Sequence, residues 1–124
     1  MNLVAIAGGA VLGAWLRWVL GLWLNPLVPT LPLGTLAANL LGGLIIGCFM
    51  STAEPLGLSP AVRLFVVTGF LGALTTFSTF SAETVTLLMR EQYAWAAGAL
   101  SAHLAGSLMM TGVGVLIGRA LLAR

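Results

Sequence analysis

A dense group of hydroxyl and aromatic side chains lies between residues 75 and 81 of an otherwise apolar chain. This segment reads Thr-Thr-Phe-Ser-Thr-Phe-Ser and follows two glycines, Gly69 and Gly72. Hydroxyl groups both donate and accept hydrogen bonds, and the edge of an aromatic ring carries partial positive charge. Because the segment contains no acidic residue, its chemistry suits the binding of a small anion better than that of a cation.

Small and polar residues recur at steps of four along three other apolar stretches, so that the members of each series share a helix face. The series are Gly9, Gly13, Arg17 and Gly21; Thr35, Asn39, Gly43 and Gly47; and His103, Ser107 and Thr111. Asn39 is interpreted either as a hydrogen-bonded clamp between helices or as an amide donor along an anion path. Arg17 is interpreted either as part of a packing face, reaching the lipid headgroups, or as a fixed cation at a pore mouth.

The sequence contains little that indicates catalysis. The chain has no nucleophile–base pair, paired carboxylates, phosphate-binding loop or cluster of metal ligands, so we expect it not to be an enzyme. Its single cysteine, Cys48, excludes an intrachain disulfide. The five basic residues are scattered arginines, which argues against nucleic acid as a partner. The roles of Glu83 and His103, both set in apolar surroundings, stay open.

The elements that carry these residues must be membrane helices. The chain has 124 residues, of which 60% are hydrophobic and only 6% charged, whereas charged residues make up about 25% of an ordinary soluble domain. A soluble domain needs a polar surface. In lipid the outer surface must instead be apolar, and the backbone must satisfy its own hydrogen bonds. The apolar runs are long and do not alternate with polar residues, so we predict an all-α membrane protein.

Four spans are predicted within a single transmembrane domain covering residues 1–124. Prolines and polar turns separate them, and they run approximately over residues 3–23, 34–51, 61–89 and 94–121. The third span exceeds the ~20 residues that a membrane helix needs. It also contains the two glycines and the hydroxyl-rich segment, which weaken helix propensity. We therefore predict that the third helix is broken in mid-membrane, where freed carbonyls must be buried in protein or line a cavity.

The distribution of arginine bears on orientation. Four spans place both termini on one side, together with Arg63, Arg119 and Arg124, whereas Arg90 lies on the other side. This bias weakly favours cytoplasmic termini, and a weak bias permits insertion in both orientations. One small bundle has little interior for a pore, so the hypothesis is an antiparallel, dual-topology homodimer with its pores at the interface.

The chain resembles the Fluc (CrcB) family of fluoride channels over essentially its whole length. Three motifs carry the resemblance: Gly-Ala-Trp-Leu-Arg-Trp at 13–18, Gly-Thr-Leu-Ala-Ala-Asn-Leu-Leu-Gly at 34–42, and Gly-Ala-Leu-Thr-Thr-Phe-Ser-Thr-Phe-Ser at 72–81. The third is the most specific, because the Thr-Thr-Phe-Ser-Thr-Phe string falls on the span that is expected to be broken. Trp18, Ala73 and His103 depart from residues that are common in the family.

The resemblance implies a function and an assembly. Members are multi-pass proteins of the bacterial inner membrane that export cytoplasmic fluoride passively. They are dual-topology homodimers with two separate fluoride pores, so the expected partners are fluoride, the lipid bilayer and a second copy of the chain. A structural sodium ion (Na+) at the dimer centre is held by backbone carbonyls from the two third-helix breaks. By motif position these carbonyls belong to Gly72 and Thr75.

The resemblance also implies site residues. Phe77 and Phe80 would face the pores and coordinate fluoride, and Asn39 would donate to it. Arg17 would stand at the pore mouth or vestibule. The remaining members of the polar path would be Ser78, Thr79, Ser81, Ser107 and Thr111.

Two other classes of protein, and a different assembly, stay open at this point. A small multidrug transporter also has four spans and inserts in both orientations, but it usually places a glutamate in the first span, where this chain has Arg17. A non-transporting assembly subunit would explain the glycine stripes by packing alone. It would not explain paired phenylalanines and many hydroxyls beside a helix break. Within the channel reading, a heterodimer with a paralogue stays open beside the homodimer.

Overall fold

Helices form all the regular structure of the computed structural model, which describes residues 1–124. Helix α1 (Asn2–Leu24) continues into the short 3-10 turn η1 (Asn25–Leu27), and is followed by α2 (Leu33–Thr52). The last helix, α6 (Tyr93–Leu122), is the longest. Together with the third span, these give four helices long and apolar enough to cross a membrane, as predicted. Their ends lie within a few residues of those expected from the sequence.

The third span (60–89) is broken, which confirms the prediction. Four segments make up this span: α3 (Pro60–Arg63), η2 (Leu64–Leu71), α4 (Gly72–Leu74) and α5 (Phe77–Met89). At the break Thr75 and Thr76 are extended, with φ/ψ of −82°/151° and −148°/114°. Segment η2 is a π-helix, whose wider turns the sequence pattern did not predict.

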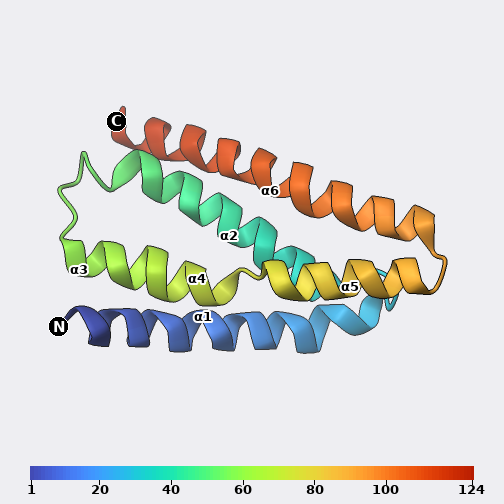
Figure 1. Cartoon of the computed structure of the whole chain (residues 1–124). Helices are drawn as coiled ribbons and strands as arrows, with labels where there is room; N and C mark the ends of the chain where they lie inside the picture. The colour runs from blue at the N-terminus through green and yellow to red at the C-terminus, as the bar shows by residue number, and fades with distance from the viewer.

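The four spans lie side by side with both chain termini at the same end (Figure 1). Helix α1 packs along η2 and α4, and α2 packs along α6. The loops that join α1 to α2 and α5 to α6 lie at the opposite end from the termini. The break between α4 and α5 therefore falls near the middle of the bundle, where a membrane protein has no water to satisfy loose backbone groups.

Glycine stripes form the contacts between these helices. Gly9 of α1 faces Gly69 of η2 so closely that a Cβ on Gly69 would lie 3.0 Å from the Cα of Gly9. On α2, a Cβ on Gly43 would lie 2.8 Å from the backbone carbonyl oxygen of Ser107 on α6. Such close approach of backbones is the usual role of small residues in membrane helices. The glycine series found in the sequence are thus packing faces.

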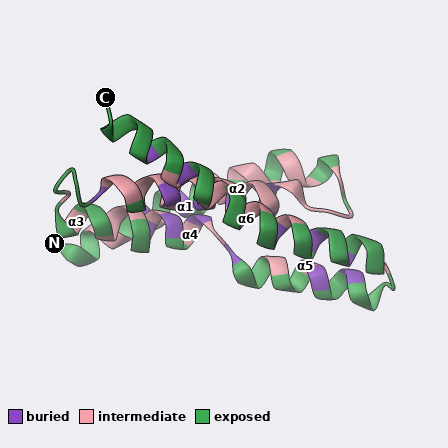
Figure 2. Cartoon of the chain, turned by 90° about the horizontal axis from the view of Figure 1, so that it is seen from above, coloured by how far each residue is buried: buried purple, intermediate pink, exposed green.

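Little of the single chain is buried. Only 20 of 124 residues are buried, and the central apolar cluster consists of Ala38, Leu71 and Leu74. Buried residues gather mainly where α1, α2 and α4 meet, while α5 and the outer turns of α6 are largely exposed (Figure 2). Large apolar side chains such as Trp15 and Trp23 point outward. This pattern is typical of a chain that is covered by lipid or by a second protein.

Candidate functional site

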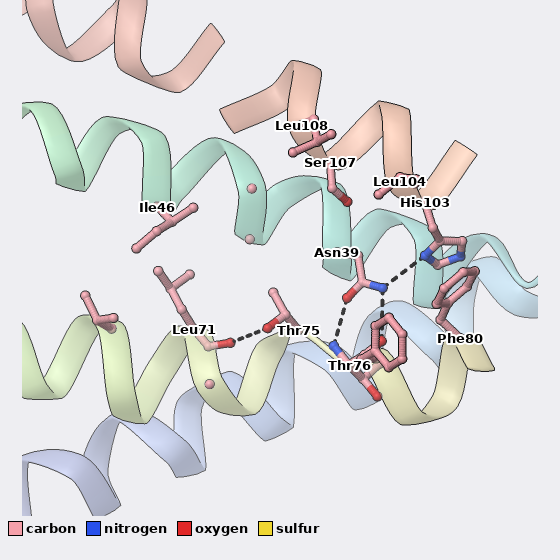
Figure 3. Close-up of a pocket in the computed structure, with 15 residues that line it drawn as sticks. Asn39, Ile46, Leu71, Thr75, Thr76, Phe80, His103, Leu104, Ser107 and Leu108 are labelled. Carbon is pink, nitrogen blue, oxygen red and sulfur yellow. Dashed lines mark hydrogen bonds between the residues drawn. The ribbon is translucent and has the colours of Figure 1, made fainter. Parts of the chain in front are cut away.

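An open cavity of about 520 Å³ lies beside the break in the third span (Figure 3). Residues from α2, η2, α4, α5 and α6 and from the break itself line it. Its polar and aromatic lining comprises Asn39, Thr75, Thr76, Phe77, Phe80, His103 and Ser107. The cavity therefore brings together six residues that the sequence placed on the anion path or at the sodium site: Asn39, Gly72, Thr75, Phe77, Phe80 and Ser107.

Asn39 of α2 holds the broken backbone. Its Oδ1 accepts a hydrogen bond from the Thr76 amide at 2.8 Å, and its Nδ2 donates to the Thr76 carbonyl at 3.1 Å. One side chain thus satisfies both backbone groups of an extended residue that is only 6% exposed. A buried backbone group without a partner costs about 1–3 kcal/mol, so this pairing makes a break at membrane depth tolerable.

The second hydrogen of the Asn39 amide is also used within the chain. Nδ2 lies 3.0 Å from Nδ1 of His103 on α6, so both amide hydrogens and the amide oxygen have partners. This arrangement supports the interpretation of Asn39 as a clamp between helices. Donation from Asn39 to an anion requires the release of one of these bonds, and that role stays a prediction.

Thr76 and His103 were not assigned roles from the sequence. The hydroxyl of Thr76 accepts a hydrogen bond from the Thr79 amide at 3.1 Å and so caps the start of α5. A threonine directly before a helical run is a recognised N-cap signal, and that signal was present in the sequence. His103, whose role the sequence left open, is buried at 4% exposure. No sequence pattern pointed to its contact with Asn39.

The break also frees two carbonyls, those of Gly72 and Thr75. In an unbroken helix they would accept from the amides of Thr76 and Thr79, four residues on. Those amides instead donate to Asn39 Oδ1 and to the Thr76 hydroxyl. Both carbonyls therefore remain available for another donor or for a cation.

Three aromatic rings meet at the start of α5. Phe80 stacks on the His103 ring, with centroids 4.4 Å apart and planes at 28°. Phe77 meets Phe80 edge to face, at 5.7 Å and 76°. Phe80 is half-buried beside the cavity, whereas Phe77 is 80% exposed in the single chain. Both phenylalanines therefore line the cavity, and Phe77 also reaches the outer surface of the single chain.

The other expected site residues lie outside the cavity. Ser78, Thr79 and Ser81 are exposed on α5, and Thr111 follows one turn after Ser107 on α6, where its hydroxyl donates to the Ser107 carbonyl at 2.9 Å. Arg17 is half-buried on α1 and does not line the cavity. Their expected roles stay predictions.

Thr35 and Glu83 make a second polar link between α2 and α5. The Thr35 hydroxyl donates to the Glu83 carboxyl oxygen at 2.7 Å. Thr35 lies one turn before Asn39 on α2, and Glu83 lies about one turn after Phe80 on α5. The polar residues therefore form a file that continues from the cavity toward the end of the bundle opposite the termini.

The sequence is similar to known proteins over most of its length. The model of the CrcB-like protein, Camphor Resistance (CrcB) family matches residues 4–115. A fluoride-specific ion channel FluC from Nitrosospira multiformis is 62% identical over 115 residues, covering 92% of this chain and 90% of the relative. Proteins of the same name from Thiobacillus denitrificans and Pseudomonas syringae pv. maculicola are 59% and 56% identical, covering 90% and 93% of this chain and 90% and 91% of the relatives.

These relatives are named as ion channels, which are not enzymes, and this protein is likewise not an enzyme. Its four apolar helices make it a multi-pass membrane protein. The match over residues 4–115, together with 62% identity to a relative of which 90% is covered, shows that the chain belongs to the CrcB family.

Proposed function

We propose that the chain forms a fluoride-selective channel through which fluoride leaves the cytoplasm passively. The names of the similar proteins support the substrate. The observation that carries the proposal is a cavity beside a helix break, lined by hydroxyls, an amide, an imidazole and ring edges, with no acidic side chain among its lining residues. Fluoride is small and strongly hydrated, so compact donors are needed to replace its water.

We further propose that two copies assemble as an antiparallel homodimer with two pores. In the single chain Phe77 is 80% exposed, and Ser78, Thr79 and Ser81 on the same helix are exposed as well. Hydroxyl groups facing lipid are unfavourable, and polar groups in membranes normally face protein or a water-filled path. A partner covering α5 would remove these hydroxyls from lipid and place the exposed ring of Phe77 at the interface.

An antiparallel arrangement is supported by the weak charge bias of the loops. Both termini lie at one end (Figure 1), and arginines occur near both ends of the bundle. The expected location is the bacterial inner membrane. A cysteine placed at the C-terminus of a Cys48→Ala variant should be labelled by impermeant reagents from both sides. Labelling from only one side would eliminate dual topology, and pull-down of a differently sequenced partner would favour a paralogue heterodimer.

A structural Na+ ion fits the break. The free carbonyls of Gly72 and Thr75 offer two uncharged oxygen ligands per chain, and Gly72 is exposed in the single chain. Hard cations prefer oxygen ligands of this kind. The ion would stabilise the interface by neutralising the dipoles of opposed carbonyls. Exchanging Na+ for N-methylglucamine should then lower the melting temperature of the dimer, and an unchanged melting temperature would exclude the ion.

Fluoride efflux from liposomes tests the function directly. Purified protein should release fluoride rapidly, as read by a fluoride electrode, and should release no chloride in a parallel chloride measurement. Phe80→Met keeps the apolar volume but removes the ring edges, so flux should fall. Phe49→Met, on α2 away from the cavity, is the matched control and should retain flux. A folded dimer that releases no fluoride would refute the channel and revive the transporter reading.

A further inference from the structure

His103 is the only histidine of the chain, and the hydrogen bonds of Asn39 indicate which of its ring nitrogens carries the proton. The Asn39 amide cannot be turned over, because Oδ1 accepts from the Thr76 amide and Nδ2 donates to the Thr76 carbonyl. The nitrogen that faces His103 Nδ1 at 3.0 Å is therefore a donor. Nδ1 must act as the acceptor, and a neutral imidazole then carries its hydrogen on Nε2.

The Nε2–H group is a donor without a partner in the chain. No hydrogen bond is made by Nε2, and Gln92 Oε1 is the only fully buried side-chain polar atom without a hydrogen-bond partner. It follows that Nε2 is not sealed in apolar surroundings, although the His103 residue as a whole is only 4% exposed. Because His103 lines the cavity, this unpaired donor is available to a small acceptor there.

The ring is also held in place. Phe80 stacks on it with a centroid distance of 4.4 Å, and Asn39 anchors its Nδ1 edge. In Figure 3 the second nitrogen lies on the side of the ring away from Asn39. Two contacts therefore fix the direction of the Nε2–H bond, which reduces the cost of ordering it when an anion arrives.

We infer that His103 binds the permeating anion through Nε2–H, as a neutral donor whose tautomer is set by Asn39. This inference rests on the proposed function and names a donor within it. Asn39 donates one amide hydrogen to the Thr76 carbonyl and the other to His103 Nδ1. The hydrogen that remains available for an anion is therefore the one on His103 Nε2. Selection for a small anion follows, because fluoride is a stronger hydrogen-bond acceptor than chloride.

Because the chain contains one histidine, nitrogen NMR of protein labelled with 15N-histidine in lipid reports on this residue alone. At neutral pH the spectrum should show one protonated and one unprotonated ring nitrogen, and a long-range correlation to the carbon-bound ring protons should assign the proton to Nε2. Fluoride should shift the Nε2–H resonance, while chloride at the same concentration should not. A proton on Nδ1, a doubly protonated ring, or an Nε2–H signal indifferent to fluoride would overturn the inference.

Two substitutions test the two nitrogens of the His103 ring separately. The Oδ1 of an asparagine lies where Nδ1 lies in histidine, so His103→Asn keeps the acceptor for Asn39 and loses the Nε2 donor. In His103→Gln the side-chain amide nitrogen reaches the position of Nε2 and keeps a donor there. Fluoride efflux should fall about 10-fold or more in His103→Asn, the equivalent of one lost charge-assisted hydrogen bond. His103→Gln should retain most of it.

The readouts keep this inference apart from the channel proposal. If the unsubstituted protein releases no fluoride, the proposed function fails. If it releases fluoride and His103→Asn does so equally fast, only the role of His103 fails. Both variants are compared as dimers on size exclusion before the flux measurement, and the NMR measurement on unsubstituted protein decides the matter where a variant does not fold.

Discussion

Removal of the Asn39 side chain should destabilise the protein through the break in the third span. In Asn39→Ala the amide and carbonyl of Thr76 both lose their partners, at a residue that is 6% exposed. Each unsatisfied buried group costs about 1–3 kcal/mol, so the expected loss is about 2–6 kcal/mol. This prediction concerns folding and does not depend on the identity of the permeating ion.

Thermal unfolding in detergent measures the effect. For a chain of this size 1 kcal/mol corresponds to roughly 4 °C, so Asn39→Ala should melt about 10–20 °C below the unsubstituted protein. Thr111→Val is the matched control. It also removes a polar group from a membrane helix, but the Thr111 hydroxyl donates only to Ser107, within its own helix. Its melting temperature should change by at most a few degrees.

The reasoning is refuted if Asn39→Ala melts within about 2 °C of the unsubstituted protein, because about 0.5 kcal/mol is less than the cost of one unpaired group. That result would mean that water enters the cavity and satisfies Thr76. Asn39→Asp provides a second check. Its carboxylate keeps the acceptor for the Thr76 amide but opposes the Thr76 carbonyl with a second acceptor, so it should also lower the melting temperature.

Three further outcomes follow from individual contacts. Gly47→Ala would place a Cβ against a backbone carbonyl of α6 and should lower stability by about 1–3 kcal/mol in thermal unfolding, while Gly98→Ala, with nothing within 4 Å, should raise it by up to about 1 kcal/mol. Thr35→Val leaves Glu83 Oε1 without its donor and should lower the melting temperature by several degrees; no change would mean that the pair is not stabilising. Phe77→Ser, at a side chain 80% exposed in the single chain, should weaken dimerisation in crosslinking titrations, and unchanged crosslinking would remove Phe77 from the interface.

The sequence predicted most of the fold because membrane helices leave strong signals. Long apolar runs marked the spans, and the prolines between Pro26 and Pro32 and the polar turns at 54–57 and 90–92 marked their ends. The break in the third span was predictable because glycines and hydroxyl residues coincide there with excess length. The π-helical turns of η2 were not, because a pattern of apolar residues along 64–71 is equally compatible with an α-helix.

The sequence predicted several of the residues that line the cavity but not the hydrogen bonds between them. Asn39, Phe80 and Ser107 do gather beside the break. Yet Asn39 could be interpreted equally as a clamp or as an ion donor, because an amide has the same appearance in a sequence whichever partner it finds. The contact of His103 with Asn39 joins residues 64 positions apart, and spacing along one helix cannot report on such a distant pair.

The π-helical segment η2 (Leu64–Leu71) bears on where the chain can gain or lose residues during evolution. A π-helical turn is what an α-helix becomes when it absorbs one inserted residue. The third span therefore has a place where its length can change by one residue while the break and α5 keep their positions. In α2, by contrast, Gly43 and Gly47 lock the register against α6. When family members are aligned, gaps inside the spans should therefore be sought first in the third span and last in α2.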